Sequence, residues 1–220
     1  MTQARPANGA PTAWTLVALF LAMAGPLLVA MFSNQIATSP ETLDPRAFSL
    51  LLFVLMLVAI VAIGTKRECL LLKDLGFRRS SWRSLIWAAP IVAFFVFVFG
   101  PTAYAALDAL NLGSFDAGRQ ILETLPRWYL ALAIIVVAGG EEWLYRGYVI
   151  ERLERITGNV WIAGAVSLCA FAFAHLPLWG PGPALTTLAS GAVLTLLYLW
   201  RRDVLMLMVA HVATDLTGLM

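Results

Sequence analysis

Residues 47–64 read AFSLLLFVLMLVAIVAIG, a run of eighteen positions without a single charged side chain. An α-helix rises about 1.5 Å per residue, so about 20 mainly apolar residues are needed to cross the hydrocarbon core of a bilayer. A run of this length and composition therefore predicts a transmembrane helix.

Similar apolar runs recur along the chain, at about 13–32, 84–104, 128–149, 160–176, 183–199 and 204–220. Of the 220 residues, 60% are hydrophobic and only 13% are charged, whereas an average soluble domain is about 25% charged. The first run is too long for the apolar core of a signal peptide and is read as a retained span. We therefore predict an all-α fold, a polytopic membrane helix bundle of about seven transmembrane helices that forms a single integral membrane domain over residues 1–220.

The distribution of lysine and arginine predicts how the bundle is oriented. Three alternate connectors hold most of these residues, at 65–83, 151–157 and 201–202. The opposite side has only three, Arg46, Arg119 and Arg127. Because cytoplasmic connectors are enriched in lysine and arginine, we expect a cytoplasmic N-terminus and an external C-terminus. Within the first basic connector, residues 66–75 fit either an interfacial helix or a solvated loop.

Six ionisable residues lie within or beside the apolar runs, and they include both histidines of the chain: Glu141, Glu142, Arg146, His175, His211 and Asp215. A charge inside a bilayer is costly, so such residues are by default candidates for function, each with a partner. The net charge of +2 gives no reason to expect a nucleic-acid partner.

The first group of these residues follows two glycines on the fourth run. Glu142 and Arg146 are four positions apart, with the acid first, and can therefore pair on one helix face. Glu141 is rotated by about 100° from Glu142 and faces elsewhere. The pair alone could be an ion pair that locks the bundle, but that interpretation leaves Glu141 unexplained.

The other groups lie on the fifth and last runs. Phe171 and His175 share a helix face, and a histidine at a helix end is often structural. His211 and Asp215 are four positions apart, so the carboxylate can hydrogen-bond the imidazole and fix its tautomer. A buried His–Asp pair can equally pin two helices together.

The sequence places His175 at a different depth in the membrane from its expected partners, Glu141 and His211. Counting along the runs puts His175 nearer the outer face than Glu141 or His211. A tilt or break near Gly164, or a longer fifth span, is expected to bring the three level.

Taken in order, the three groups resemble the motifs of the CPBP family, the CAAX proteases and bacteriocin-processing enzymes also called Abi proteins. These motifs are Glu-Glu-x-x-x-Arg, Phe-x-x-x-His and His-x-x-x-Asn or Asp. The resemblance covers about 128–220, the expected catalytic core, and extends weakly to 72–79. Tyr145 stands where the family has an aromatic residue, often Phe, and Asp215 stands where many members have Asn.

The resemblance implies a glutamic-type intramembrane endopeptidase that works without a covalent intermediate and without a metal or other cofactor. Glu141 would activate a water with help from His175. His211, oriented by Asp215, would stabilise the oxyanion, and Arg146 would hold Glu142. The substrate would be a membrane-associated protein or peptide.

Three alternatives remain open from the sequence. Glutamate and histidine can bind zinc, so a zinc-dependent membrane protease is possible, although no His-Glu-x-x-His helix is present. Buried ionisable residues also serve transporters and proton relays, and a non-catalytic membrane scaffold could retain the motifs for stability. The substrate could be a prenylated tail, a bacteriocin leader or a C-terminal sorting anchor. A small single-domain membrane chain suggests the bacterial inner membrane, and the oligomeric state is left open.

Overall fold

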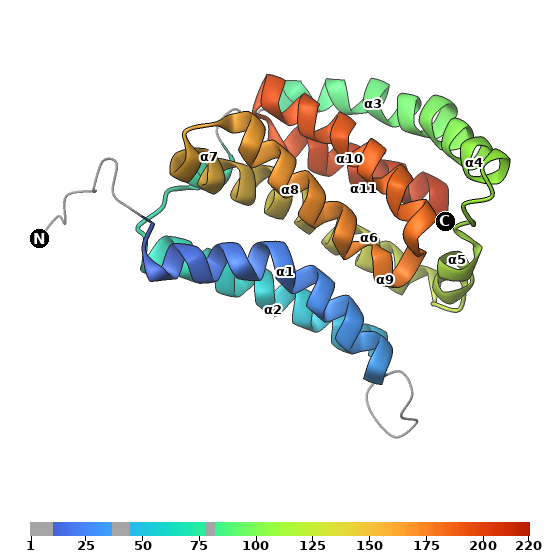
Figure 1. The fold of residues 1–220 in the computed structure, drawn as a ribbon, viewed down its shortest axis with the longest axis horizontal. Coiled ribbons are helices and arrows are strands. Elements are labelled where there is room, and N and C mark those ends of the chain that lie inside the picture. Colours follow the sequence, from blue (N-terminus) through green and yellow to red (C-terminus); the bar gives the residue numbers. More distant parts are fainter. Residues whose placement is uncertain (1–10, 37–44, 78–81) are drawn as a thin grey trace, which may run out of the picture.

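The computed structural model describes residues 11–36, 45–77 and 82–220, and all regular structure within these ranges is helical (Figure 1). Six helical elements in this part of the chain are long and apolar enough to span a membrane, and a shorter apolar helix follows them. This confirms the predicted polytopic α-helical bundle, and the protein is an integral membrane protein.

In chain order, the six spanning elements are α1 (Ala13–Ile36), α2 (Pro45–Lys66), α3–η3–α4 (Ala88–Phe94, Phe95–Phe99 and Gly100–Ala109), α6–η4–α7 (Arg127–Glu141, Glu142–Ile150 and Glu151–Thr157), α8–α9 (Val160–Ala174 and Leu176–Trp179) and α10 (Pro181–Arg201). The shorter apolar helix is α11 (Val204–Leu219). Three short elements lie between them, η1 (Leu72–Leu75), η2 (Trp82–Trp87) and α5 (Asp116–Glu123). The α1–α2 pair flanks one side of the bundle and α3–α4 the other, with the remaining long helices between them (Figure 1).

The bundle is organised around the π-helix η4, whose nine residues are all buried. It packs against α1, α8 and α11. Large apolar side chains on other helices point outward, among them Phe20, Phe97, Trp128 and Trp161. Apolar residues thus cover the outside as well as the centre, which is the pattern expected of helices that face lipid.

The fourth spanning element is longer than the sequence suggested. The apolar run ends near residue 149, but the helix continues through α7 to Thr157. Its charged residues stay helical because each finds a partner on another element. Arg152 pairs with Glu68, Arg155 with Asp74 at 2.6 Å, and Arg202 bonds both Glu151 and Glu154 at 2.7 Å. We call these seven residues the ionic latch.

The ionic latch brings the three basic connectors to one end of the bundle, the left end in Figure 1. Burial lowers the pKa of Arg202, but hydrogen bonds to Glu154 and Glu151 raise it by more, so the pKa lies above its ordinary value. Arg202 therefore keeps its charge across the physiological range. Arg78 and Arg79 of the first basic connector lie outside the described residues. Which side of the membrane this end faces stays a prediction.

The stretch 66–75 forms neither a regular interfacial helix nor a purely solvated loop. It contains only the four-residue 3-10 helix η1, in which Asp74 and Leu75 are buried. The Leu75 carbonyl accepts a hydrogen bond of 3.0 Å from the Trp143 indole. Gly76, at φ 98°, lies so close to Gly147 that an added Cβ would be 2.3 Å from its Cα. This segment is therefore docked directly on η4.

Candidate active site

The two adjacent glutamates sit where the central helix changes its geometry. Glu141 is the last residue of α6 and Glu142 the first residue of η4. Just before them, a Cβ added at Gly140 would lie 2.8 Å from the Phe53 ring. The glycine therefore lets α2 pack closely against this point, and both glutamates are buried, Glu142 completely.

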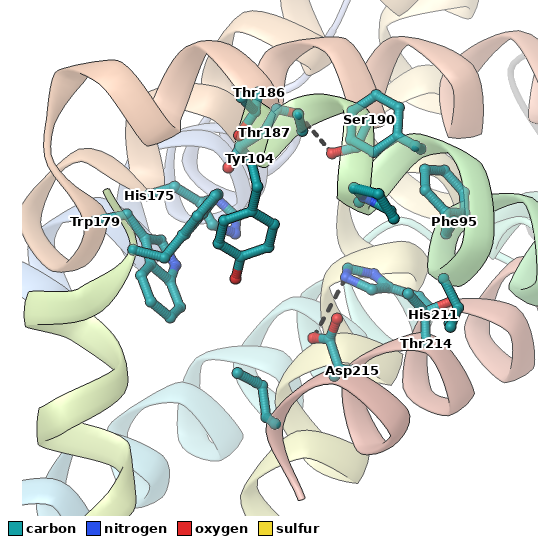
Figure 2. A pocket seen from close by; sticks show the side chains of 18 of the residues that line it. Phe95, Tyr104, His175, Trp179, Thr186, Thr187, Ser190, His211, Thr214 and Asp215 are labelled. Carbon is teal, nitrogen blue, oxygen red and sulfur yellow. Dashed lines mark hydrogen bonds and ion pairs between the residues drawn. The ribbon is translucent and has the colours of Figure 1, made fainter. Parts of the chain in front are cut away.

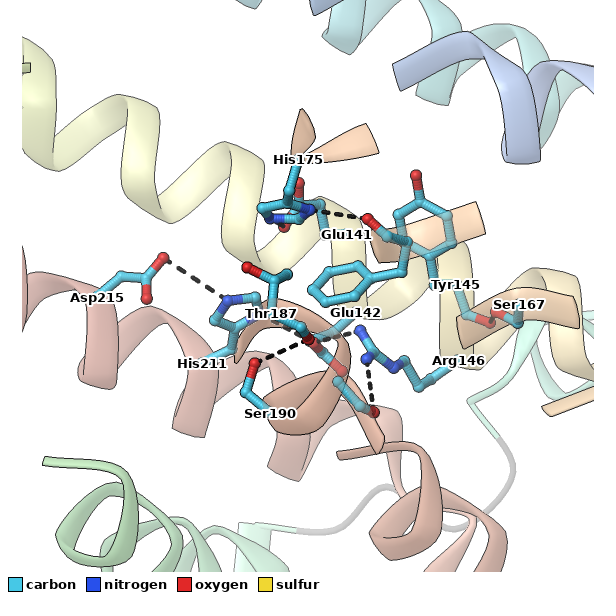
Figure 3. A network of polar contacts seen from close by, with 12 residues as sticks. Glu141, Glu142, Tyr145, Arg146, Ser167, His175, Thr187, Ser190, His211 and Asp215 are labelled. Carbon is cyan, nitrogen blue, oxygen red and sulfur yellow. Dashed lines mark hydrogen bonds and ion pairs between the residues drawn. The ribbon is translucent and has the colours of Figure 1, made fainter. Parts of the chain in front are cut away.

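One half of the site is closed by direct hydrogen bonds around Glu142 (Figure 3). Its Oε1 accepts from Arg146 Nη1 at 2.8 Å and contacts His211 Nδ1 at 2.9 Å. Arg146 Nη2 donates to the Gly191 carbonyl at 3.1 Å, and its guanidinium lies 4.2 Å above the Phe171 ring. The Glu142–Arg146 pair predicted from the i, i+4 spacing is present, and it also reaches α8, α10 and α11.

The other half of the site, around Glu141, is looser. Glu141 Oε2 lies 4.0 Å from His175 Nε2 (Figure 3). His175 Nδ1 lies 2.8 Å from the Phe171 carbonyl, which can only accept, so Nδ1 carries a proton. In the neutral ring Nε2 therefore offers a lone pair toward Glu141.

A second carboxylate lies closer to the His211 ring than Asp215, the partner that the spacing indicated. Asp215 Oδ2 is 3.6 Å from His211 Nε2, which is longer than a hydrogen bond. The direct bond to the imidazole comes instead from Glu142, which is 69 residues away in sequence. His211 is thus held at Nδ1, while Nε2 faces the Asp215 carboxylate.

The depth conflict over His175 is resolved by the long fourth element. Glu141 precedes Thr157, the last residue of α7, by sixteen positions. His175 follows Val160, the first residue of α8, by fifteen. The two side chains are therefore level, and α8 runs through Gly164 without a break. The break near Gly164, one of the expected explanations, is absent. The fifth span is longer than expected, Val160–Trp179, and the fourth element extends further at its latch end than its apolar run.

A pocket of about 440 Å³ opens beside the looser half (Figure 2). His175, His211 and Asp215 line it together with aromatic side chains from three other elements. The six predicted site residues thus form one cluster, of which three reach the pocket wall. Glu142 and Arg146 are buried behind it.

Sequence reasoning missed several other residues that line this pocket, among them Tyr104, Arg119 and Trp179. Two of these residues lie on α4 and α9, and Arg119 lies on α5, in a stretch that reads only as a polar connector. No local spacing connects them to the three motifs, since only the tertiary fold brings them together. Within the described ranges, no group of three or more His, Cys, Asp or Glu side chains is placed to hold a metal ion.

Comparisons with known proteins agree with the motifs. Residues 123–217 match the model of a protein family described as type II CAAX prenyl endopeptidase, Rce1-like. Searches of curated proteins and of solved structures gave no match. The matched segment contains all six residues of the cluster, and it supports a CAAX-type membrane endopeptidase in general. Over these residues the chain is similar to type II CAAX prenyl endopeptidases, which agrees with the CPBP resemblance drawn from the motifs.

Proposed function

We propose that this protein is an intramembrane endopeptidase that hydrolyses a peptide bond in a membrane-associated protein or peptide, with Glu141 as the base that activates water. The observation that carries the proposal is the 4.0 Å separation of Glu141 Oε2 and His175 Nε2 beside the pocket. This distance is too long for a direct hydrogen bond but suits two groups that share one water.

A water in this position would donate one hydrogen to the Glu141 carboxylate and the other to His175 Nε2. Its oxygen lone pairs would then be free to attack a carbonyl carbon presented from the pocket. As the new C–O bond forms, Glu141 takes a proton from the water. When the C–N bond breaks, Glu141 returns that proton to the leaving nitrogen, so the products are a carboxylic acid and an amine.

His211 is the group best placed to stabilise the oxyanion. Its Nδ1 is held by Glu142, and its Nε2 lies at the pocket wall, 3.6 Å from Asp215. When Nε2 also carries a proton, it donates to the developing oxyanion in a site that excludes most water. Arg146 acts one step further back as a positioning residue, because it holds the carboxylate that holds His211.

The test is cleavage of labelled membrane peptides by the purified full-length protein in liposomes. The peptides represent a prenylated C-terminal tail, a bacteriocin leader and a C-terminal sorting anchor. We expect at least one to be cut, with and without prolonged chelation, and none to be cut by a Glu141→Gln/His175→Ala double variant prepared identically. Activity that is lost with bound zinc and restored by zinc would replace this mechanism with a metal-dependent one, and cleavage of no peptide would refute the proposed function.

The location proposed for the protein is the bacterial inner membrane, with the ionic latch in the cytoplasm. The support is the concentration of arginine and lysine at the latch end. Reporter fusions after Arg202 should read cytoplasmic and fusions after Met220 external, and the reverse at both sites would overturn the orientation.

A further inference from the structure

Tryptophan and arginine side chains gather at the latch end of the bundle, the left end in Figure 1. Five of the eight tryptophans lie there with exposed side chains: Trp14, Trp82, Trp87, Trp161 and Trp200. Arginines of the same end lie over four of these rings, Arg67 over Trp14, Arg83 over Trp82, and Arg201 over both Trp87 and Trp200. Because exposed tryptophans mark the depth of the lipid headgroups, these arginines stand at headgroup level.

Arg201, the last residue of α10, differs from its neighbour Arg202 in what it contacts. Arg202 is paired within the ionic latch. The Arg201 side chain forms no ion pair or hydrogen bond with the described residues, and its Nε is buried without a partner. Its guanidinium carbon lies 4.8 Å from the centre of the Trp87 ring and 5.4 Å from that of Trp200. Cation–π contact holds the group through the ring faces and leaves its N–H donors available to a ligand.

An unpaired guanidinium at headgroup level fits the phosphodiester of a phospholipid. A guanidinium binds phosphate oxygens in a bidentate, charge-assisted fashion. The surface beside it is apolar: Leu196 lies one helical turn before Trp200 on the same face of α10 and is 54% exposed, and Ile86, next to Trp87, is 71% exposed. A phosphate at Arg201 would therefore continue into acyl chains that lie along apolar side chains. A soluble anion would gain the charge contact alone.

We propose that Arg201, Trp87 and Trp200 form a binding site for the headgroup phosphate of an anionic phospholipid at the latch end. The two indoles fix the guanidinium, and the guanidinium binds the phosphate. The other cations of this end, among them Lys66 and Arg67, favour a headgroup with net negative charge over a zwitterionic one. The site lies outside the proposed catalytic cluster and does not depend on the proposed function.

The bound lipid would complete the turn between α10 and α11. Arg202 is held by the ionic latch. The Asp203 side chain accepts a hydrogen bond of 3.1 Å from the Met206 N–H in the first turn of α11. With a phosphate on Arg201, all three consecutive residues of this turn are held. The start of α11, the helix that carries His211, would then be fixed in part by the lipid.

Binding is measured on the full-length protein in an uncharged detergent by native mass spectrometry. The probes are dioctanoyl phosphatidylglycerol and dioctanoyl phosphatidylcholine. Wild type should bind phosphatidylglycerol about tenfold more tightly, a difference of about 1.4 kcal/mol, because the choline cation is repelled by the basic end. Arg201→Gln should bring the ratio close to one. Arg201→Lys keeps the charge but loses the bidentate contact, and Trp87→Leu removes one ring, so both should give intermediate ratios.

Lys66→Gln is the matched control. Lys66 is exposed at the same end, and its replacement removes the same charge, but no indole of the described residues lies under it. The variant should keep most of the wild-type preference. Phosphatidylglycerol should also raise the thermal midpoint of wild type and Lys66→Gln more than that of Arg201→Gln, and the same curves show whether Arg201→Gln is folded.

Three outcomes would overturn the proposal. The first is the absence of a preference in wild type, and the second is an undiminished preference in folded Arg201→Gln. The third is an equal loss in Lys66→Gln, which would show diffuse attraction to the basic end instead of a site. Glycerophosphoglycerol, the same headgroup without acyl chains, identifies the source of the phosphate. It should compete only weakly, and competition equal to that of the lipid would assign Arg201 to a soluble phosphate compound and refute the lipid site.

Discussion

The two halves of the site differ in how short their polar contacts are. Around Glu142, contacts of 2.8, 2.9 and 3.1 Å connect Arg146, His211 and the Gly191 carbonyl. Around Glu141, the corresponding distance to His175 is 4.0 Å, and Asp215 stands 3.6 Å from His211. Two neighbouring glutamates thus have opposite surroundings, because one residue of helix rotation directs them to different helices.

This difference suggests a structural role for Glu142 and a role in the reaction for Glu141. A buried carboxylate that already bonds an arginine and a histidine has no room for a reacting water, but it fixes the geometry of its neighbours. A carboxylate with a gap in front of it has room for the water. The comparison therefore assigns stability mainly to Glu142 and reactivity mainly to Glu141, and substitutions can test each assignment.

The largest effect is expected at the open half. Glu141→Gln keeps the size of the side chain but removes the base, so cleavage should fall by about 10²–10⁴-fold. The thermal midpoint should stay near that of wild type, because no close bond is lost. Cleavage rates of the purified protein measure the loss of activity, and thermal unfolding curves measure the midpoint. A fully active Glu141→Gln would remove the basis for separating the halves.

At the closed half the main expected effect is on stability. Glu142→Gln leaves Arg146 buried without its carboxylate, and the loss of one partner of a buried ion pair costs about 3–5 kcal/mol in soluble proteins. Activity should fall as well, because His211 loses its acceptor. Both quantities are measured in the same detergent as for wild type.

Glu154→Gln is a useful control for that experiment. Glu154 also pairs with an arginine, but its side chain is 31% exposed and Arg202 keeps Glu151. Its loss should cost no more than about 1 kcal/mol. If Glu142→Gln proves as stable as Glu154→Gln, the closed half does not support the fold in the way described.

The smallest effect is expected at Asp215, which touches His211 only at a longer distance. Asp215→Asn should keep most of the activity, because an amide can accept from His211 or donate to an oxyanion. Asp215→Leu can do neither and should lose about tenfold, the order of one hydrogen bond. Initial cleavage rates of the two variants on one peptide give the comparison. Equal activity of the Asn and Leu variants would show that Asp215 takes no polar part in the reaction.

The fold was predictable because the bilayer imposes a length on each apolar run. The spans near 13–32 and 47–64 coincide with α1 and α2 to within a few residues. The latch end of the fourth span was not predictable in this way, since a hydropathy count stops where charge begins. Residues 151–157 are charged, and the partners that keep them helical come from distant parts of the chain.

In the site, too, contacts within one helix could be predicted from the sequence, whereas contacts between helices could not. Spacing on one helix was enough to predict the Glu142–Arg146 pair, which the structure contains. Spacing also suggested that Asp215 orients His211, but Glu142 makes the shorter contact from another helix. A sequence offers the nearest candidate along the chain, whereas packing selects the nearest candidate in space.

The π-helix η4 connects Glu141, the proposed base, to the ionic latch, and this makes the number of residues between them important. Glu141 lies at one end of η4 and Arg152 just beyond the other, where its pairing with Glu68 holds it in place. Adding or deleting one residue within 142–150 would turn Glu141 about the helix axis relative to Arg152 by one residue of helix rotation. Glu141 would then point toward a different helix from the one that carries His175. The ionic latch therefore fixes the direction in which the Glu141 side chain points from the helix axis.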